Sequence, residues 1–245
     1  MSNDEPPEPE RILVITAHPD DVDFGAAGTV ASWTADGIEV SYCLVTSGDA
    51  GGQDLTQSFE DRSALREAEQ TAAAAAVGVT QLHFLRHPDG RVVADLALRR
   101  DLSRVIRQVR PQRVLTQSPE RNLDRIYASH PDHLATGDAA LAAVYPDARN
   151  PFAHTELLND EGLEPWSVDD TWVMGGPMTP DHARVTVDIT DHFDRKVAAL
   201  RAHASQTAHR DDLEDMLRQW TADTARAGGL PDGRLAEMFR RIDTR

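Results

Sequence analysis

Apolar residues occur along this chain in short uninterrupted runs, separated by longer stretches with helical spacing. The run Ile12-Leu13-Val14-Ile15 has no polar alternation, which is typical of a strand buried on both faces in a parallel sheet. Similar runs predict five more strands, at 39–46, 82–85, 113–116, 171–174 and 185–189. A sheet of such strands must be covered by helices on both faces.

Helical patterns lie between these strands. The clearest is a stripe with i, i+4, i+7, i+8 spacing, formed by Leu98, Leu102, Val105, Ile106 and Val109. Further helices are expected at 25–33, 59–77, 134–144, 191–200 and 213–220, and a final short helix is expected after the turn 228–233. The alternation of strand and helix predicts an α/β fold, a Rossmann-like three-layer sandwich with a mostly parallel sheet.

The length of the chain and the positions of its proline-rich segments indicate one domain. A chain of 245 residues suits a single large α/β domain, here 11–245, and the acidic, proline-rich residues 1–10 predict a disordered tail. The polar, proline-punctuated segment 146–165 is interpreted as an insertion near the substrate pocket. The apolar stripe of the 213–220 helix is expected to be core or an oligomer contact, which leaves a homo-oligomer open.

The charge and composition of the chain restrict the classes of partner that it can be expected to bind. With 41 acidic and 25 basic residues the formal net charge is -16, which disfavours a nucleic-acid or anionic membrane partner and favours a small-molecule substrate. No window approaches the roughly 20 apolar residues of a membrane span, and the N-terminus does not have the pattern of a secretory signal. We therefore expect a cytoplasmic protein. Cys43, the only cysteine, lies in an apolar run and is expected to be a buried thiol.

Polar chemistry is concentrated where the first apolar run ends. His18, Pro19, Asp20 and Asp21 follow that run directly, and Pro19 restricts the backbone on both sides of itself. His18 and Asp21 can then converge on a metal ion, while Asp20 faces the same cavity without having to be a ligand. By itself this cluster could equally be a turn with capping aspartates.

A second His-Pro-Asp cluster, His130-Pro131-Asp132-His133, follows the strand at 113–116. Pro131 suits the first position of a helix, which places His133 on its first turn. In a doubly wound sheet the first and fourth strands are neighbours at the point where the strand order reverses, so their carboxyl ends would bring both clusters together.

The two clusters together predict a metal centre. His18, Asp21 and His133 form the three-ligand set of a catalytic zinc site with an open fourth position, and Asp20 and His130 remain as a base and an acid. The ion could also be Fe²⁺, because the same ligands describe the facial triad of non-haem Fe(II) oxygenases. A catalytically silent metal-binding protein is a third reading.

These paired motifs, with smaller matches between them, resemble the zinc-dependent de-N-acetylases of the LmbE-like or PIG-L family over about residues 11–206. The resemblance implies an LmbE-like fold and hydrolysis of a linear amide, with removal of an acyl group from an N-acylated amino sugar or glycoconjugate by attack of metal-bound water, Asp20 acting as general base. Val22 stands where the family commonly has glutamate, which leaves the substrate open.

The resemblance also suggests further site residues. Arg66, in an Arg-x-x-Glu pattern with Glu69, would reach the substrate pocket; the alternative is a solvated helix residue. Asp89, in a Pro-Asp-Gly turn, would contact substrate, although such a turn needs no function. His203, in a His-x-Ser-Gln segment, would lie near the pocket or on the surface. Asp132 would orient a neighbouring imidazole.

Overall fold

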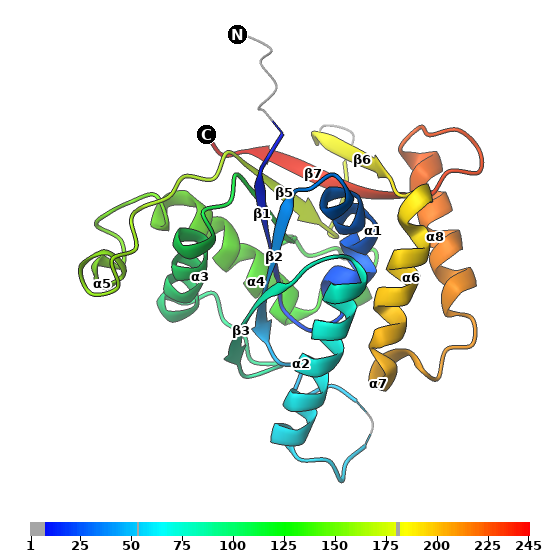
Figure 1. Ribbon diagram of the computed structural model, residues 1–245, viewed down its shortest axis with the longest axis horizontal. Helices are drawn as coiled ribbons and strands as arrows, with labels where there is room; N and C mark the ends of the chain where they lie inside the picture. The colour runs from blue at the N-terminus through cyan, green and yellow to red at the C-terminus, as the bar shows by residue number, and fades with distance from the viewer. Residues whose placement is uncertain (1–7, 53, 180–181) are drawn as a thin grey trace.

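The computed structural model describes residues 8–52, 54–179 and 182–245. The first seven residues of the expected disordered tail lie outside this range. Within it, seven strands form one sheet in the order β3-β2-β1-β4-β5-β7-β6 (Figure 1). The strands are β1 Arg11–Thr16, β2 Glu39–Thr46, β3 Gln81–His87, β4 Arg113–Gln117, β5 Asp170–Met174, β6 Arg184–Asp188 and β7 Ala236–Asp243.

The helices connect these strands in the expected alternation. They are α1 Asp21–Ala35, α2 Phe59–Ala76, α3 Leu96–Val109, α4 Pro131–Ala142, α5 Thr155–Asn159, α6 Phe193–Ala202, α7 Ala204–Thr207 and α8 Leu213–Ala227. Short 3₁₀ turns lie at Ile126–Ala128 and Thr190–His192, and a wider turn lies at Ala143–Asp147. None of the helices in the described ranges is both long and apolar enough to cross a bilayer.

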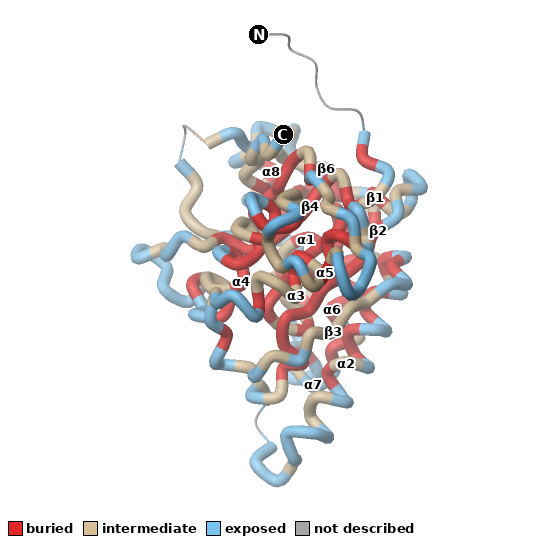
Figure 2. The backbone as a smooth tube through the Cα atoms, turned by 90° about the vertical axis from the view of Figure 1, so that its left-hand side faces the viewer, coloured by how far each residue is buried: buried red, intermediate tan, exposed pale blue. Residues whose placement is uncertain are grey.

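Successive residues of β1 face opposite sides of the sheet. Ile12 and Val14 join a core with residues of α1, α2 and α6, whereas Leu13 and Ile15 join a core with residues of α3 and α4. These are the three layers predicted from the uninterrupted apolar run, and the three-layer α/β fold is confirmed. Figure 2 shows the buried backbone running through the centre of the molecule and the exposed residues around it.

Strand order reverses at β1. It pairs in parallel with β2 on one side and with β4 on the other, while β3 and β5 extend the parallel sheet outward. The carboxyl ends of β1 and β4 are therefore adjacent, as the first and fourth strands of the prediction were expected to be. This edge of the sheet is where a doubly wound fold binds ligands.

The last predicted helix is wrong. Residues Ala236–Asp243 form β7, which lies between β5 and β6 and is antiparallel to both. The segment is rich in helix-forming residues, but β5 on one side and β6 on the other give its backbone hydrogen-bond partners along both edges. Tertiary pairing here overrides local propensity.

The segment 146–165 does not lie near the site, contrary to expectation. Arg107 of α3 donates hydrogen bonds to carbonyl oxygens in the first part of this segment, including those of Asp147 and Ala153. Trp166, which follows the segment, donates to the carbonyl of Pro111 just before β4 and lies under the guanidinium of Arg11, where β1 begins. The segment is thus anchored at the amino ends of the strands, on the edge opposite the clusters.

The apolar stripe of α8 is mostly core. Leu213 and Leu217 are buried against Phe193 and Leu200 of α6, whereas Trp220 stays 45 % exposed.

Close packing of α4 on β4 allows a test of the fold. A Cβ at Gly137 would lie 2.3 Å from the carbonyl oxygen of Gln117. Helix propensity alone would make Gly137→Ala stabilising by about 1 kcal/mol. We expect the opposite sign, a loss of about 1–3 kcal/mol in the free energy of unfolding, because the helix must move off the strand. Urea denaturation measures it, with Asp138→Ala on the exposed face of α4 as control; a Gly137→Ala protein as stable as that control would contradict this packing.

Candidate metal and catalytic site

The first cluster forms the connection between β1 and α1. The backbone N–H of Ala17, just after β1, donates to Oε1 of Gln117 at the end of β4 over 2.9 Å, which joins the two strand ends. Helix α1 begins at Asp21, four residues earlier than its small-residue pattern indicated. Asp21 therefore lies on the first helical turn, and its Oδ2 accepts a hydrogen bond from the backbone N–H of His18 over 2.7 Å.

The second cluster forms the start of α4. Pro131 occupies the first turn of the helix, as predicted, and His130 precedes it as the capping residue. His133 lies on the same first turn and points toward the first cluster. Its Nε2 lies 3.0 Å from Oδ1 of Asp21 and 3.2 Å from Nδ1 of His18. The two clusters, more than a hundred residues apart in sequence, thus meet at the carboxyl edge of the sheet.

Donor atoms of three residues converge here in a way that suits one cation. Nδ1 of His18 and Nε2 of His133 lie 3.2 Å apart, and each lies close to a different oxygen of Asp21: Nδ1 of His18 is 3.2 Å from Oδ2, and Nε2 of His133 is 3.0 Å from Oδ1. Ligands about 2.1 Å from a shared tetrahedral ion would be about 3.4 Å apart. Two imidazole nitrogens and a carboxylate are also the donor types that zinc takes, so these residues fit the ion that the sequence predicts.

The other ring nitrogen of His18 is held by two carboxylates. Nε2 lies 3.0 Å from Oδ1 of Asp89 and 3.2 Å from Oδ2 of Asp132. Such partners fix the tautomer with the proton on Nε2 and leave Nδ1 free to bind a metal. Burial disfavours a charged imidazole, but the carboxylates of Asp21, Asp132 and Asp89 outweigh it and raise the pKa of His18 to about 12. The surroundings of His18 therefore favour positive charge, which a proton or a cation can supply.

Two other sets of side chains also come within metal-binding distance of one another: His18 with Asp89 and Asp132, and His18 with His130 and His133. In the first set the oxygens of Asp132 already accept the backbone N–H groups of Gly90 and Val92, over 2.7 and 3.2 Å. Both oxygens of Asp132 are engaged in this way, whereas among the described residues only Oδ2 of Asp21 accepts a backbone N–H, so Asp21 is the better candidate ligand of the two. That Asp132 orients His18 stays a prediction.

Asp20 directly precedes Asp21 and caps the start of α1. Its Oδ2 lies 3.1 Å from the guanidinium of Arg66, whereas its Oδ1 accepts no hydrogen bond from the described residues. Burial raises the pKa of Asp20 to about 7, against the opposing charge of Arg66 and with the help of the neighbouring Asp21 carboxylate. The group can therefore exchange a proton near neutral pH.

His130 stands at the mouth of the site with its ring 4.9 Å from that of His18, centre to centre. Its Nδ1 accepts the backbone N–H of Asp132 over 3.2 Å, so the proton of the neutral ring is on Nε2. Burial, together with the neighbouring rings of His18 and His133, lowers the pKa of His130. The arrangement favours a neutral hydrogen-bond donor over the imidazolium acid considered from sequence.

Of the remaining sequence candidates, Arg66 and His203 are buried and Asp89 is partly buried. Arg66 is 4 % exposed, so it is no solvated helix residue; it contacts Asp20. His203 is fully buried with Nε2 2.8 Å from Oδ2 of Asp23, which rules out the surface alternative. Asp89 uses one oxygen on His18 and the other on the backbone N–H of Ala50, 3.0 Å away. Substrate contacts by these residues stay a prediction.

Sequence reasoning missed several buried polar residues around the site. Asp23 and Gln70 are fully buried and hydrogen-bonded to each other, and Lys196 forms a 2.7 Å ion pair with Glu237 of β7. Val22, which replaces the family's glutamate, is a core residue, and the buried carboxylate stands one position later, at Asp23. Gln70 carried a signal, since it falls in the same helical stripe as the buried Ala73 and Ala74, where a polar residue needs a partner.

A cavity of about 690 Å³ opens beside the site, between the glycine-rich loop after β2 and α7. Its lining includes Gly51, Arg62, Ser205 and His209. Gly51 packs directly on the guanidinium of Arg66, which separates this cavity from Asp20. The cavity is therefore in contact with the site through Arg66 and not through the carboxylates or imidazoles of the two clusters.

Comparison with known proteins agrees with the fold and the clusters. The model of the GlcNAc-PI de-N-acetylase (PIG-L) family matches residues 13–144, a stretch that holds both His-Pro-Asp clusters. A diacetylchitobiose deacetylase from Thermococcus kodakarensis is 32 % identical over 80 % of this chain and 70 % of its own length. A 1D-myo-inositol 2-acetamido-2-deoxy-alpha-D-glucopyranoside deacetylase from Mycobacterium sp. (strain JLS) is 31 % identical over 80 % of this chain and 74 % of its own.

A solved structure is similar as well. The N,N'-diacetylchitobiose deacetylase from Pyrococcus horikoshii superposes with a TM-score of 0.84 and 29 % identity, over 97 % of this chain and 85 % of that one. All three relatives are named as deacetylases. The chain belongs to the GlcNAc-PI de-N-acetylase (PIG-L) family, and the resemblance noted from its sequence is confirmed.

Proposed function

We propose that this protein is a zinc-dependent de-N-acetylase that hydrolyses the amide of an N-acylated amino sugar or glycoconjugate. One observation carries the proposal: ring nitrogens of His18 and His133 lie 3.2 Å apart with the two oxygens of Asp21 3.0–3.2 Å from them, and the preceding residue, Asp20, is paired with Arg66 through one oxygen only. The names of the relatives supply the substrate class, since those relatives are named for N-acetylated sugars.

In the proposed reaction, the bound ion and the side chains of the protein have separate roles. A divalent ion bound by His18, Asp21 and His133 would polarise the acyl carbonyl and make water more acidic. Asp20 takes the proton from the attacking water through its free Oδ1 as the new C–O bond forms. His130 donates a hydrogen bond from Nε2 to the acyl oxygen as negative charge develops there. Asp20 then gives its proton to the nitrogen as the C–N bond breaks, so the products are a carboxylic acid and a free amine.

The sugar would occupy the neighbouring cavity. Its lining combines polar side chains, Arg62, Ser205 and His209, with the apolar side chain of Leu65, so it could contact both the hydroxyl groups and the apolar face of a sugar ring. Arg66, held between Asp20 and the glycine-rich loop, separates the acyl end from the sugar end. A direct bond from Arg66 or Asp89 to a substrate hydroxyl remains part of this proposal.

An amine-release assay tests the proposed function. Zinc-loaded protein is incubated in anaerobic buffer with a panel of N-acetylated amino sugars and their glycoconjugates, and free amine and acetate are quantified. We expect equal amounts of both from at least one substrate, loss of the activity with a chelator, and its return with zinc. No release from any member of the panel, or product formation that requires oxygen, would contradict the proposal; the latter would favour the oxygenase reading.

A further inference from the structure

The backbone of Asp20 is held in an unfavourable conformation. Its φ of 88° and ψ of -23° lie in the left-handed region, which a residue with a side chain rarely adopts. Strain of this kind persists where surrounding contacts enforce it, and it concentrates at functional sites. The contacts that enforce it here can be named.

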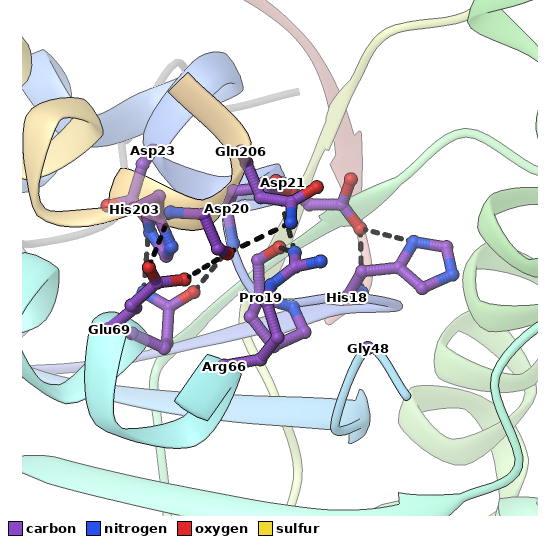
Figure 3. Close-up of polar contacts among 12 residues, drawn as sticks. His18, Pro19, Asp20, Asp21, Asp23, Gly48, Arg66, Glu69, His203 and Gln206 are labelled. Atoms are coloured by element: carbon purple, nitrogen blue, oxygen red, sulfur yellow. Dashed lines mark hydrogen bonds and ion pairs between the residues drawn. The ribbon is translucent and has the colours of Figure 1, made fainter. Parts of the chain in front are cut away.

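Two side chains of helix α2 form hydrogen bonds with the two polar ends of the Pro19–Asp20 peptide group. The guanidinium of Arg66 donates a hydrogen bond to the carbonyl oxygen of Pro19, and Oε1 of Gln70 accepts the N–H of Asp20 over 2.8 Å. Arg66 and Gln70 are four residues apart, so they lie on the same face of the helix. Figure 3 shows Arg66 beside Pro19 and Asp20. One peptide plane is thus fixed from both of its polar ends, and that plane sets φ of Asp20.

Gln70 is itself oriented by a buried acid. Its Nε2 donates to Oδ2 of Asp23 over 2.9 Å, and the same oxygen lies 2.8 Å from Nε2 of His203. A carboxylate only accepts hydrogen bonds, so Asp23 forces the amide of Gln70 to turn its oxygen toward Asp20. Gln70, Asp23 and His203 are all fully buried, and Figure 3 places Asp23 and His203 on the same side of Asp20.

His203 is held in turn from α2. Glu69 accepts hydrogen bonds from both the backbone N–H and the hydroxyl of Ser205, each over 2.7 Å. The contact fixes the start of α7, two residues after His203. The Arg-x-x-Glu and His-x-Ser patterns therefore belong to one network of hydrogen bonds. The last contacts of this network are with the peptide group between Pro19 and Asp20.

We propose that Gln70, oriented by Asp23 and His203, is a positioning residue for the deacetylation. Together with Arg66 it clamps the Pro19–Asp20 peptide and thereby holds the Asp20 carboxylate at a set position relative to His18. Without the clamp, φ of Asp20 would return to negative values, and the peptide plane would turn about the N–Cα bond of Asp20. The inference rests on the proposed function, because it is the base of that reaction that is positioned.

Gln70→Met tests the clamp, since methionine fills a similar volume without a hydrogen-bond acceptor for Asp20. Gln112→Met is the matched control, because Oε1 of Gln112 also accepts a backbone N–H, that of Arg11, at the opposite end of β1. Asp23→Asn serves as a second variant that keeps Gln70 in place but lets its amide turn over. For each protein we would measure kcat, KM, zinc content and, in the metal-free state, hydrogen exchange of the Asp20 amide.

For Gln70→Met we expect kcat to fall by about 10²-fold with KM and zinc content unchanged, as for a reacting group displaced by about 1 Å. The Asp20 amide should exchange at least about ten-fold faster, because its hydrogen bond is lost. Asp23→Asn should likewise lower kcat and speed the exchange of the Asp20 amide, whereas Gln112→Met should change neither kcat nor this exchange rate. Unchanged kcat and exchange in Gln70→Met and Asp23→Asn would overturn the inference and leave the proposed function standing. Absence of turnover in the unmodified protein would instead overturn the proposed function, and the inference with it.

Discussion

Asp20→Asn is expected to lower kcat by about 10²–10⁴-fold, the range that general acid–base catalysis supplies. The amide keeps the size of the side chain and a hydrogen-bonding partner for Arg66, but it cannot accept the proton of the attacking water. Asp20 lies outside the three convergent donors, so the zinc content of the variant should equal that of the unmodified protein. Steady-state kinetics on the best substrate of the amine-release panel, with metal analysis of the same sample, measures both.

Asp36→Asn is a suitable control for this variant. Asp36 caps the far end of the same helix and is exposed, so its loss should change neither kcat nor zinc content. An Asp20→Asn protein with full kcat would remove the base from the mechanism. One with little zinc would mean that Asp20 is a ligand and that the three-donor assignment is wrong.

His133→Ala is expected to weaken zinc binding by more than about 10²-fold, because loss of an outer-shell partner alone typically costs 10–100-fold and His133 is a donor itself. Its Nε2 lies within 3.2 Å of both other donors, and it is half-buried with no described polar partner outside the site. The protein should therefore stay folded while turnover at limiting zinc disappears. Competition with a chelator of known affinity measures the dissociation constant.

The control for His133→Ala is His209→Ala, which removes an exposed imidazole on the rim of the neighbouring cavity. Its zinc affinity should match that of the unmodified protein. If His133→Ala binds zinc as tightly as His209→Ala, the ion is held elsewhere, and the carboxylates of Asp89 and Asp132 become the next candidates.

Much of the parallel half of the fold could be predicted from local pattern. The first apolar run has no polar position, so it had to be covered on both faces, and the strands and helices up to α4 follow from the same periodicities. The last strand could not be predicted in this way. Ala236–Asp243 contains good helix formers, and its strand state depends on β5 and β6, which lie far from it in sequence. Non-local pairing of this kind leaves no local signal.

The candidate site, too, has a part that local sequence pattern predicts and a part that it does not. The two His-Pro-Asp clusters could be paired because each follows a strand, and neighbouring parallel strands end at one edge of a sheet. The clamp on Asp20 could not be predicted from spacing, because it needs Gln70 from α2, Asp23 from α1 and His203 from the end of α6 at hydrogen-bond distance. Only a polar residue in a buried helical stripe hinted that Gln70 had a partner.

The position of the bound ion tests the central claim most directly. Anomalous diffraction at the zinc edge, on crystals of the zinc-loaded protein, should give one strong peak about 2 Å from Nδ1 of His18, the carboxylate of Asp21 and Nε2 of His133. A peak between Nε2 of His18, Asp89 and Asp132, or no peak in this cluster at all, would contradict the account.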